Sequence, residues 1–337
     1  MNQSGFGFLL LLAAGLMNAT FTLPMKFTRR WAWENTWLVW TAFALIVLPL
    51  AAGFVTLPDI SAVYHLAGSD VIFHVALFGM GWGLAQVFFG IAVEAIGIAL
   101  TFSLVLGTSA AMGALIPLLL LHPDKLHTSA GHALLTGIAL LLVGVAVCAV
   151  AGTLRENALP AAKRSHRGNA TAGLVLAIVC GCAASFQNFG LAFGTPLVQI
   201  AIQHGANAAN ASNAIWLPLL IAGSIPNLFY CGYLFGKNST GVNFVRAGFD
   251  HWVLAFIMGA FWFGSLLLYG ASVTKLGALG PALGWPLYMS LIVVAASLVG
   301  IFTGEWKQSG RRPLVIQLAG VAVLVVAIVI LAKASQA

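Results

Sequence analysis

Long apolar runs alternate with short polar stretches along the whole chain, and this pattern predicts membrane-spanning helices. Each run is about 20 residues long, which is the length that a helix needs to cross the hydrocarbon core of a bilayer. Barrel strands would instead alternate apolar and polar residues over segments of about 10. The ten predicted spans are 5–24, 37–57, 71–93, 97–121, 131–152, 171–194, 214–235, 251–273, 280–302 and 313–332. The sequence therefore predicts an all-α membrane protein with ten transmembrane helices.

The amino-acid composition indicates the same class of protein. Hydrophobic residues make up 61% of the 337 residues and charged residues only 7%, whereas soluble domains carry about 25% charged residues. The net charge of +7 does not indicate a nucleic-acid partner, because the Lys and Arg residues lie in short loops between apolar spans. The expected surrounding is the lipid bilayer.

Neither a cofactor nor enzymatic chemistry is indicated by the sequence. All four cysteines lie inside apolar spans, where a cysteine commonly serves as a small buried hydrophobic residue. Cys180 and Cys182 have no His or acidic neighbour, so no metal site is expected there. A P-loop, a dinucleotide-binding glycine signature and a zinc-protease motif are also missing from the sequence. We therefore expect a protein that is not an enzyme and has no cofactor.

The basic residues are distributed unevenly between the two sides of the membrane. With ten spans, the odd-numbered loops lie on one side, and they hold twelve of the fifteen basic residues: Lys26, Arg29, Arg30, Arg155, Lys163, Arg164, Arg167, Lys237, Arg246, Lys307, Arg311 and Arg312. Only Lys125, Lys275 and Lys333 lie on the other side. Because basic loops stay in the cytoplasm, this bias predicts cytoplasmic odd loops and both termini outside.

One stretch, Phe78–Gly97, recurs in the second half of the chain. A shift of about 180 positions pairs Gly79 with Gly259, Trp82 with Trp262, Phe89 with Tyr269, Gly90 with Gly270, Val93 with Val273 and Gly97 with Gly277. A second repeat relates span five to span ten, where Leu142, Gly144, Val145, Ala146, Val147 and Val150 recur as Leu318, Gly320, Val321, Ala322, Val323 and Val326. Matches at spans three and eight, and at five and ten, indicate an internal duplication.

The duplication predicts two five-helix repeats of opposite orientation in the membrane. Residues 1–152 form the first repeat, 153–170 a basic cytoplasmic linker, and 171–337 the second repeat. Because five is odd, the second repeat enters the membrane upside down relative to the first. Inverted repeats with a polar site at their interface are the architecture of many secondary transporters.

Five polar side chains are predicted at hydrocarbon depth, namely those of Asn18, Gln86, Gln187, Asn188 and Ser265. Trp82 lies four residues before Gln86, and Trp262 lies three before Ser265, so each pair shares one helix face. Aromatic rings cover the C–H faces of a sugar, while amides and hydroxyls bond to its rim. We predict that these residues line one midplane cavity for a small polar solute. The alternative, favoured for Asn18 alone, is that they are interhelical contacts.

Four ionisable residues near span ends, Glu94, Glu34, His74 and Glu305, are candidate proton carriers. Moving an ionised group through a low-dielectric medium is costly, and protonation of a carboxylate removes that cost. Glu94 is the first candidate because it ends the repeated stretch, about two turns from Gln86. The alternative is that each lies at the wet membrane edge, where Glu34 could pair with Arg30 one turn earlier.

Four motifs distributed along the chain point to a family: W-x-W-E-x-x-W at 31–37, F-G-x-x-W-G at 78–83, G-L-V-L-A-x-x-C-G at 173–181 and E-W-x-x-x-G-R-R-P at 305–313. Together they resemble the L-rhamnose–proton symporters of the ten-helix drug/metabolite transporter superfamily. This resemblance implies uptake of L-rhamnose or a related 6-deoxyhexose, driven by protons, across a bacterial inner (cytoplasmic) membrane. The implied partners are a small sugar, protons and lipid, and the oligomeric state is not indicated.

Two other functions stay open at this point. The superfamily also implies exporters or facilitators of other small polar metabolites. A membrane-embedded enzyme acting on lipid-linked sugars would need an acid/base or metal cluster at membrane depth, and the sequence shows none.

Overall fold

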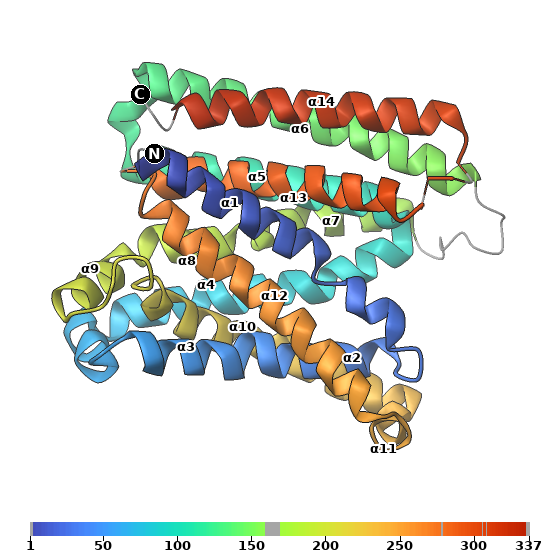
Figure 1. Ribbon diagram of the computed structural model, residues 1–337, viewed down its shortest axis with the longest axis horizontal. Coiled ribbons are helices and arrows are strands. Elements are labelled where there is room, and N and C mark those ends of the chain that lie inside the picture. The colour runs from blue at the N-terminus through green and yellow to red at the C-terminus, as the bar shows by residue number, and fades with distance from the viewer. Residues whose placement is uncertain (1–2, 159–168, 278, 305, 308, 335–337) are drawn as a thin grey trace.

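The computed structural model describes residues 3–158, 169–277, 279–304, 306–307 and 309–334 (Figure 1). Within these ranges every regular element is helical, and ten segments are long and apolar enough to cross a membrane. The α-helices are α1 (Gln3–Thr20), α2 (Trp33–Thr41), α3 (Leu48–Thr56), α4 (Ile60–Ile96), α5 (Ile98–Leu121), α6 (Ser129–Ala158), α7 (Ala170–Ala184), α8 (Phe186–Phe193), α9 (Thr195–Gln203), α10 (Asn213–Asn238), α11 (Asn243–Arg246), α12 (Phe249–Val273), α13 (Gly280–Phe302) and α14 (Arg311–Ala334). The prediction of an all-α protein with ten apolar spans is therefore confirmed.

Three of the spans are longer or less regular than the apolar pattern indicates. Span two is interrupted by a π-helical turn at Ala42–Val47, which separates α2 from α3. Span three begins at Ile60 and contains a kink at Gly68, whose φ of 79° lies outside the range of a right-handed helix. Span six is divided into α7, α8 and α9 by turns at Ser185 and Gly194.

The first residues of the predicted linker are helical. Helix α6 continues through Arg155 and Glu156 to Ala158, so the predicted boundary at 152 falls inside a helix. Both side chains are held there: the Arg155 guanidinium lies 5.2 Å from the centre of the Trp306 ring, and the Glu156 carboxylate accepts the N–H of Ala99. Residues 159–168 lie outside the described ranges.

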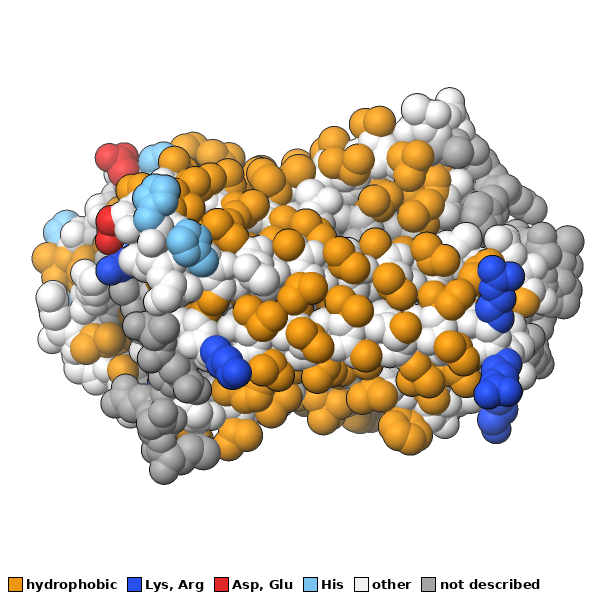
Figure 2. All heavy atoms as spheres, turned by 90° about the horizontal axis from the view of Figure 1, so that it is seen from above, with side chains coloured by type: hydrophobic (Ala, Val, Ile, Leu, Met, Phe, Trp, Pro, Cys, Tyr) orange, Lys and Arg blue, Asp and Glu red, His pale blue; other side chains and the backbone are white. Residues whose placement is uncertain are grey.

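The helices form two groups that pack on each other (Figure 1). Helices α6 and α14 run side by side and cover α5 and α13, while α2, α3, α4, α10 and α12 lie beyond them. The chain ends lie near each other at one end of the bundle, opposite the end where α14 begins. Figure 2 shows the α6–α14 face, on which hydrophobic side chains cover the middle and Lys and Arg side chains lie toward both ends.

Glycines permit the closest helix contacts. A Cβ atom on Gly79 or Gly83 of α4 would collide with the backbone of α10 at Leu219 and Gly223. Between α6 and α14, a Cβ atom on Gly144 would collide with the side chain of Leu324, and one on Gly320 would collide with Cys148. Small residues serve this purpose in membranes, because helix association there depends on close van der Waals packing and not on expulsion of water.

Candidate functional site

Two tryptophans from different halves of the chain stack inside the bundle. The ring centres of Trp82 on α4 and Trp262 on α12 are 5.3 Å apart, with an interplanar angle of 28°. Both side chains are buried, and Trp40 of α2 packs edge-on against Trp262. Gly223 of α10 leaves room for the stack, because a Cβ atom there would lie 3.0 Å from the Trp82 ring. The structure thus brings together the two tryptophans that the repeat relates.

A triangle of hydrogen bonds lies beside this stack and joins α1, α12 and α13. The amide nitrogen of Asn18 donates to the Tyr288 hydroxyl at 2.7 Å and to Ser265 Oγ at 3.2 Å. The hydroxyls of Ser265 and Tyr288 are 2.9 Å apart. Ser265 also donates to the carbonyl oxygen of Trp262, so the triangle is linked directly to the tryptophan pair.

Asn188 of α8 is hydrogen-bonded to the protein through both the nitrogen and the oxygen of its side-chain amide. Its amide nitrogen donates to the carbonyls of Gly113 and Pro281 at 2.8 and 3.0 Å, and its amide oxygen accepts from the Tyr269 hydroxyl at 2.6 Å. The Gly113 carbonyl needs such a donor, because its helical partner would be the nitrogen of Pro117, which carries no hydrogen. Asn188 therefore completes the backbone of α5.

Two tyrosines that the sequence-based site did not include connect these groups. Tyr269 of α12 and Tyr288 of α13 are buried and stack with ring centres 4.8 Å apart. Tyr269 bonds Asn188 and Tyr288 bonds Asn18, so an uncharged chain of polar groups runs from one amide to the other. Tyr269 appeared in the sequence only as a repeat position, although a hydroxyl at hydrocarbon depth was the signal that could have identified both residues.

The two predicted glutamines occupy different environments. Gln187 is 5% exposed, and its amide nitrogen has no hydrogen-bond partner among the described residues. Gly190, three residues further along α8, packs on Leu219 of α10. Gln86 lies one turn beyond Trp82 on α4 and is half-buried. No hydrogen bond within the described ranges joins either glutamine to the Asn18–Asn188 chain.

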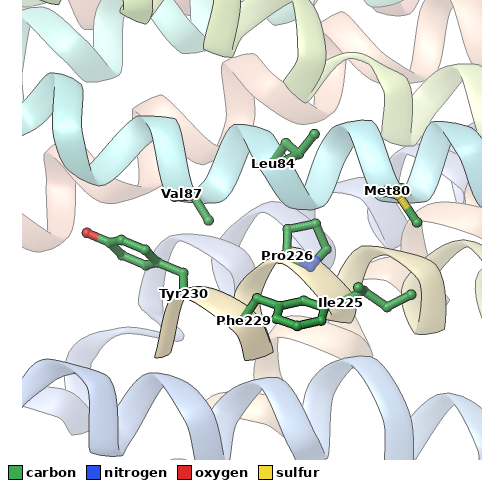
Figure 3. A pocket seen from close by; sticks show the side chains of 7 residues that line it. All are labelled: Met80, Leu84, Val87, Ile225, Pro226, Phe229 and Tyr230. Carbon is green, nitrogen blue, oxygen red and sulfur yellow. The ribbon is translucent and has the colours of Figure 1, made fainter. Parts of the chain in front are cut away.

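Two cavities open on the outside of the bundle, and neither is lined by a predicted site residue. One, of about 430 Å³, lies between α4 and α10 and is walled by apolar side chains and Tyr230 (Figure 3). The other, of about 240 Å³, lies between α5, α6, α13 and α14. Among the predicted residues, Asn18, Ser265 and Trp262 are joined by hydrogen bonds, whereas Asn188 bonds Tyr269 and two backbone carbonyls.

The candidate proton carriers are widely separated, and one of them, Glu305, lies outside the described residues. Glu34 is the only buried acidic side chain among those described, and it accepts hydrogen bonds from Asn238 Nδ2 at 3.0 Å and Thr240 Oγ1 at 2.7 Å. His74 is exposed, and its Nδ1 lies 2.7 Å from the Asp70 carbonyl of its own helix. Glu94 belongs to the last turn of α4, but its side chain lies outside the described part of the structure.

Comparison with known proteins gives a consistent result over the whole chain. The sequence profile of the L-rhamnose-proton symport protein family (RhaT) matches residues 2–336. An L-rhamnose-proton symporter from Mannheimia succiniciproducens is 26% identical over 319 residues, which cover 92% of each chain. One from Salmonella typhi is 27% identical over 317 residues, again 92% of each chain.

The match is to transporters, as the sequence predicts, and it agrees with ten apolar helices and with the absence of enzyme motifs. It extends from the first span to the last, so it covers both halves of the chain and all the polar residues of the candidate site. This protein therefore belongs to the L-rhamnose-proton symport protein family.

Proposed function

We propose that this protein imports L-rhamnose or a related 6-deoxyhexose together with protons, and that the sugar binds beside the Trp82–Trp262 stack. One observation carries the proposal: stacked indoles adjoin an uncharged chain of hydroxyl and amide groups inside the bundle. Indole faces suit the C–H faces and the methyl group of a deoxy sugar, and hydroxyls and amides suit its rim. None of the described side chains in this polar group carries a charge, which favours an uncharged solute.

Gln187 is the strongest candidate for a direct sugar contact. A buried donor without a partner is costly, and the amide nitrogen of Gln187 is such a donor. Gly190 on the same short helix packs on Leu219 of α10, and Gly223, one turn further along α10, packs on the Trp82 ring. A sugar hydroxyl on the indole face would satisfy this amide. Asn188, whose amide nitrogen and oxygen both bond to protein, instead fixes the position of Tyr269.

The transport step is alternating access by two related halves. Both pairs of repeated segments meet in space: Trp82 stacks on Trp262, and Gly144 lies against Gly320. Gly97 and Gly277, which the repeat also relates, both have positive φ, of 85° and 76°. Contacts between equivalent residues are what a two-fold relation produces. They support inverted repeats that rock about the interface that holds the sugar.

We place the basic end of the bundle in the cytoplasm and both termini outside. The support is the charge bias of the loops, which hold twelve basic residues on one side and three on the other. In this orientation Glu94 lies toward the cytoplasmic end of α4, and we propose it as the proton carrier. Impermeant thiol reagents applied to intact cells should fail to label a cysteine placed at 160–165; labelling from outside would reverse the orientation.

The substrate is tested by counterflow of a radiolabelled sugar panel in proteoliposomes. Gln187→Leu should weaken L-rhamnose binding about fivefold to tenfold, the effect of losing one hydrogen bond of about 1–1.4 kcal/mol. Gln203→Leu, at the exposed end of α9, is the matched control and should behave as the unaltered protein. If the protein exchanges no 6-deoxyhexose but does exchange another polar metabolite, the proposal is wrong.

The proton carrier is tested by separating exchange from accumulation. Glu94→Gln should abolish accumulation against a gradient and leave counterflow intact, because exchange needs no net proton movement. Glu34→Gln should affect stability more than coupling, since Glu34 holds Asn238 and Thr240. Accumulation by Glu94→Gln under a pH gradient would remove Glu94 as carrier, and a response to sodium alone would remove proton coupling.

A further inference from the structure

A second cavity, of about 240 Å³, lies away from the tryptophan pair, between the pairs α5/α13 and α6/α14. Most of its wall is apolar, with contributions from Phe102, Leu106, Val145 and Ile292. Arg155, Trp306 and Gln317 line the same cavity. The groove thus combines a hydrocarbon wall with a polar region where α6 ends and α14 begins.

The polar side chains of this groove are engaged by the protein. Gln317 donates to Ser297 Oγ at 2.7 Å. The Glu156 carboxylate accepts the N–H of Ala99 at 3.0 Å, in the first turn of α5, where the helix dipole favours negative charge. A sugar would therefore find few hydrogen-bonding groups here, whereas a hydrocarbon chain needs none.

The charge near the polar region of the groove is positive. Arg155 is positioned by the Trp306 ring beneath it, and Arg311 and Arg312 are exposed at the start of α14. In the sequence, the end of α6 and the stretch that leads into α14 contain four basic residues, Arg155, Lys307, Arg311 and Arg312. They contain two acidic residues, Glu156 and Glu305, and Glu305 lies outside the described ranges. Figure 2 shows Lys and Arg side chains at both ends of this face, on either side of its hydrophobic middle.

We propose that this groove binds an anionic phospholipid, with an acyl chain against Phe102 and Ile292 and the phosphate near Arg155 and Arg311. An apolar groove with a basic end is complementary to a lipid that carries a negative headgroup. The site gives a role to the E-W-x-x-x-G-R-R-P motif, which the sugar site does not use. Trp306 supports Arg155, and the two arginines of the motif lie at the start of α14.

The proposal is tested by native mass spectrometry of the purified full-length protein, titrated with phosphatidylglycerol or phosphatidylcholine of identical acyl chains. The anionic lipid should bind about tenfold more tightly, since each basic residue near a headgroup contributes appreciably to attraction. The double variant Arg311→Gln/Arg312→Gln should reduce this preference to about threefold or less. Ala296→Phe, which places a ring in the groove without changing charge, should weaken binding of both lipids.

The control removes the same charge from the same end of the bundle, outside the groove. Arg29→Gln/Arg30→Gln, at two exposed positions, should keep the preference for phosphatidylglycerol. Equal binding of the two lipids would overturn the proposal. So would an equal loss of preference in the control, which would indicate attraction to the whole surface, or unchanged binding in Ala296→Phe. None of these readouts depends on the transported solute.

Discussion

Asn188→Ala should destabilise the protein because three hydrogen bonds end on this one buried side chain. The substitution removes the donors to the Gly113 and Pro281 carbonyls and the acceptor for the Tyr269 hydroxyl. Hydrogen bonds between membrane helices average about 0.6 kcal/mol, so their loss amounts to about 2 kcal/mol. The Gly113 carbonyl adds to this cost, because Pro117 cannot replace the missing donor.

Pro117→Ala offers a direct test of that last contribution. An alanine at 117 supplies the N–H that the Gly113 carbonyl lacks, and one of the three interactions of Asn188 then becomes redundant. We therefore expect Asn188→Ala to cost about 0.6–1 kcal/mol less in the Pro117→Ala background than in the unaltered chain.

The measurement is reversible unfolding in mixed micelles of a mild detergent and sodium dodecyl sulfate, followed by tryptophan fluorescence. All four chains of the cycle are compared at one protein concentration. A cost below about 0.5 kcal/mol for Asn188→Ala would contradict the structural role of this residue. An equal cost in both backgrounds would contradict the pairing with the Gly113 carbonyl specifically, and would leave the other two hydrogen bonds as the explanation.

Three further predictions concern packing and backbone conformation, and the same unfolding assay checks each of them. Gly83→Ala should cost about 1–3 kcal/mol, because its Cβ meets the α10 backbone at Gly223; the control Gly236→Ala, with open space around it, should be neutral or stabilising. Gly68→Ala should cost about 1–3 kcal/mol from backbone strain alone, because its φ is 79°, its ψ is 159° and no atom is near. Trp285→Phe should cost about 1–3 kcal/mol, through a lost hydrogen bond to the Ser109 carbonyl and a smaller ring. A neutral result for any of the three would contradict the packing or conformation on which it depends.

The ten spans could be predicted because crossing a membrane is a local property of the sequence. About 20 apolar residues suffice, whatever the rest of the chain does. The segregation of basic residues is equally local, since it depends only on which loop a residue occupies. The relation between Trp82 and Trp262 was also visible, because a repeated spacing predicts a repeated environment, and the two rings do stack.

The roles of the polar residues were decided only by the tertiary structure. Asn18, Asn188 and Gln187 look alike as amides at hydrocarbon depth. Yet Asn188 makes three hydrogen bonds, Asn18 bonds Ser265 and Tyr288, and the amide nitrogen of Gln187 has no partner among the described residues. The partners of Asn18 lie 247 and 270 residues away in the chain. A hydrogen bond is specified by the distance and direction between two groups, and helix packing, which sets both, is not written in either local sequence.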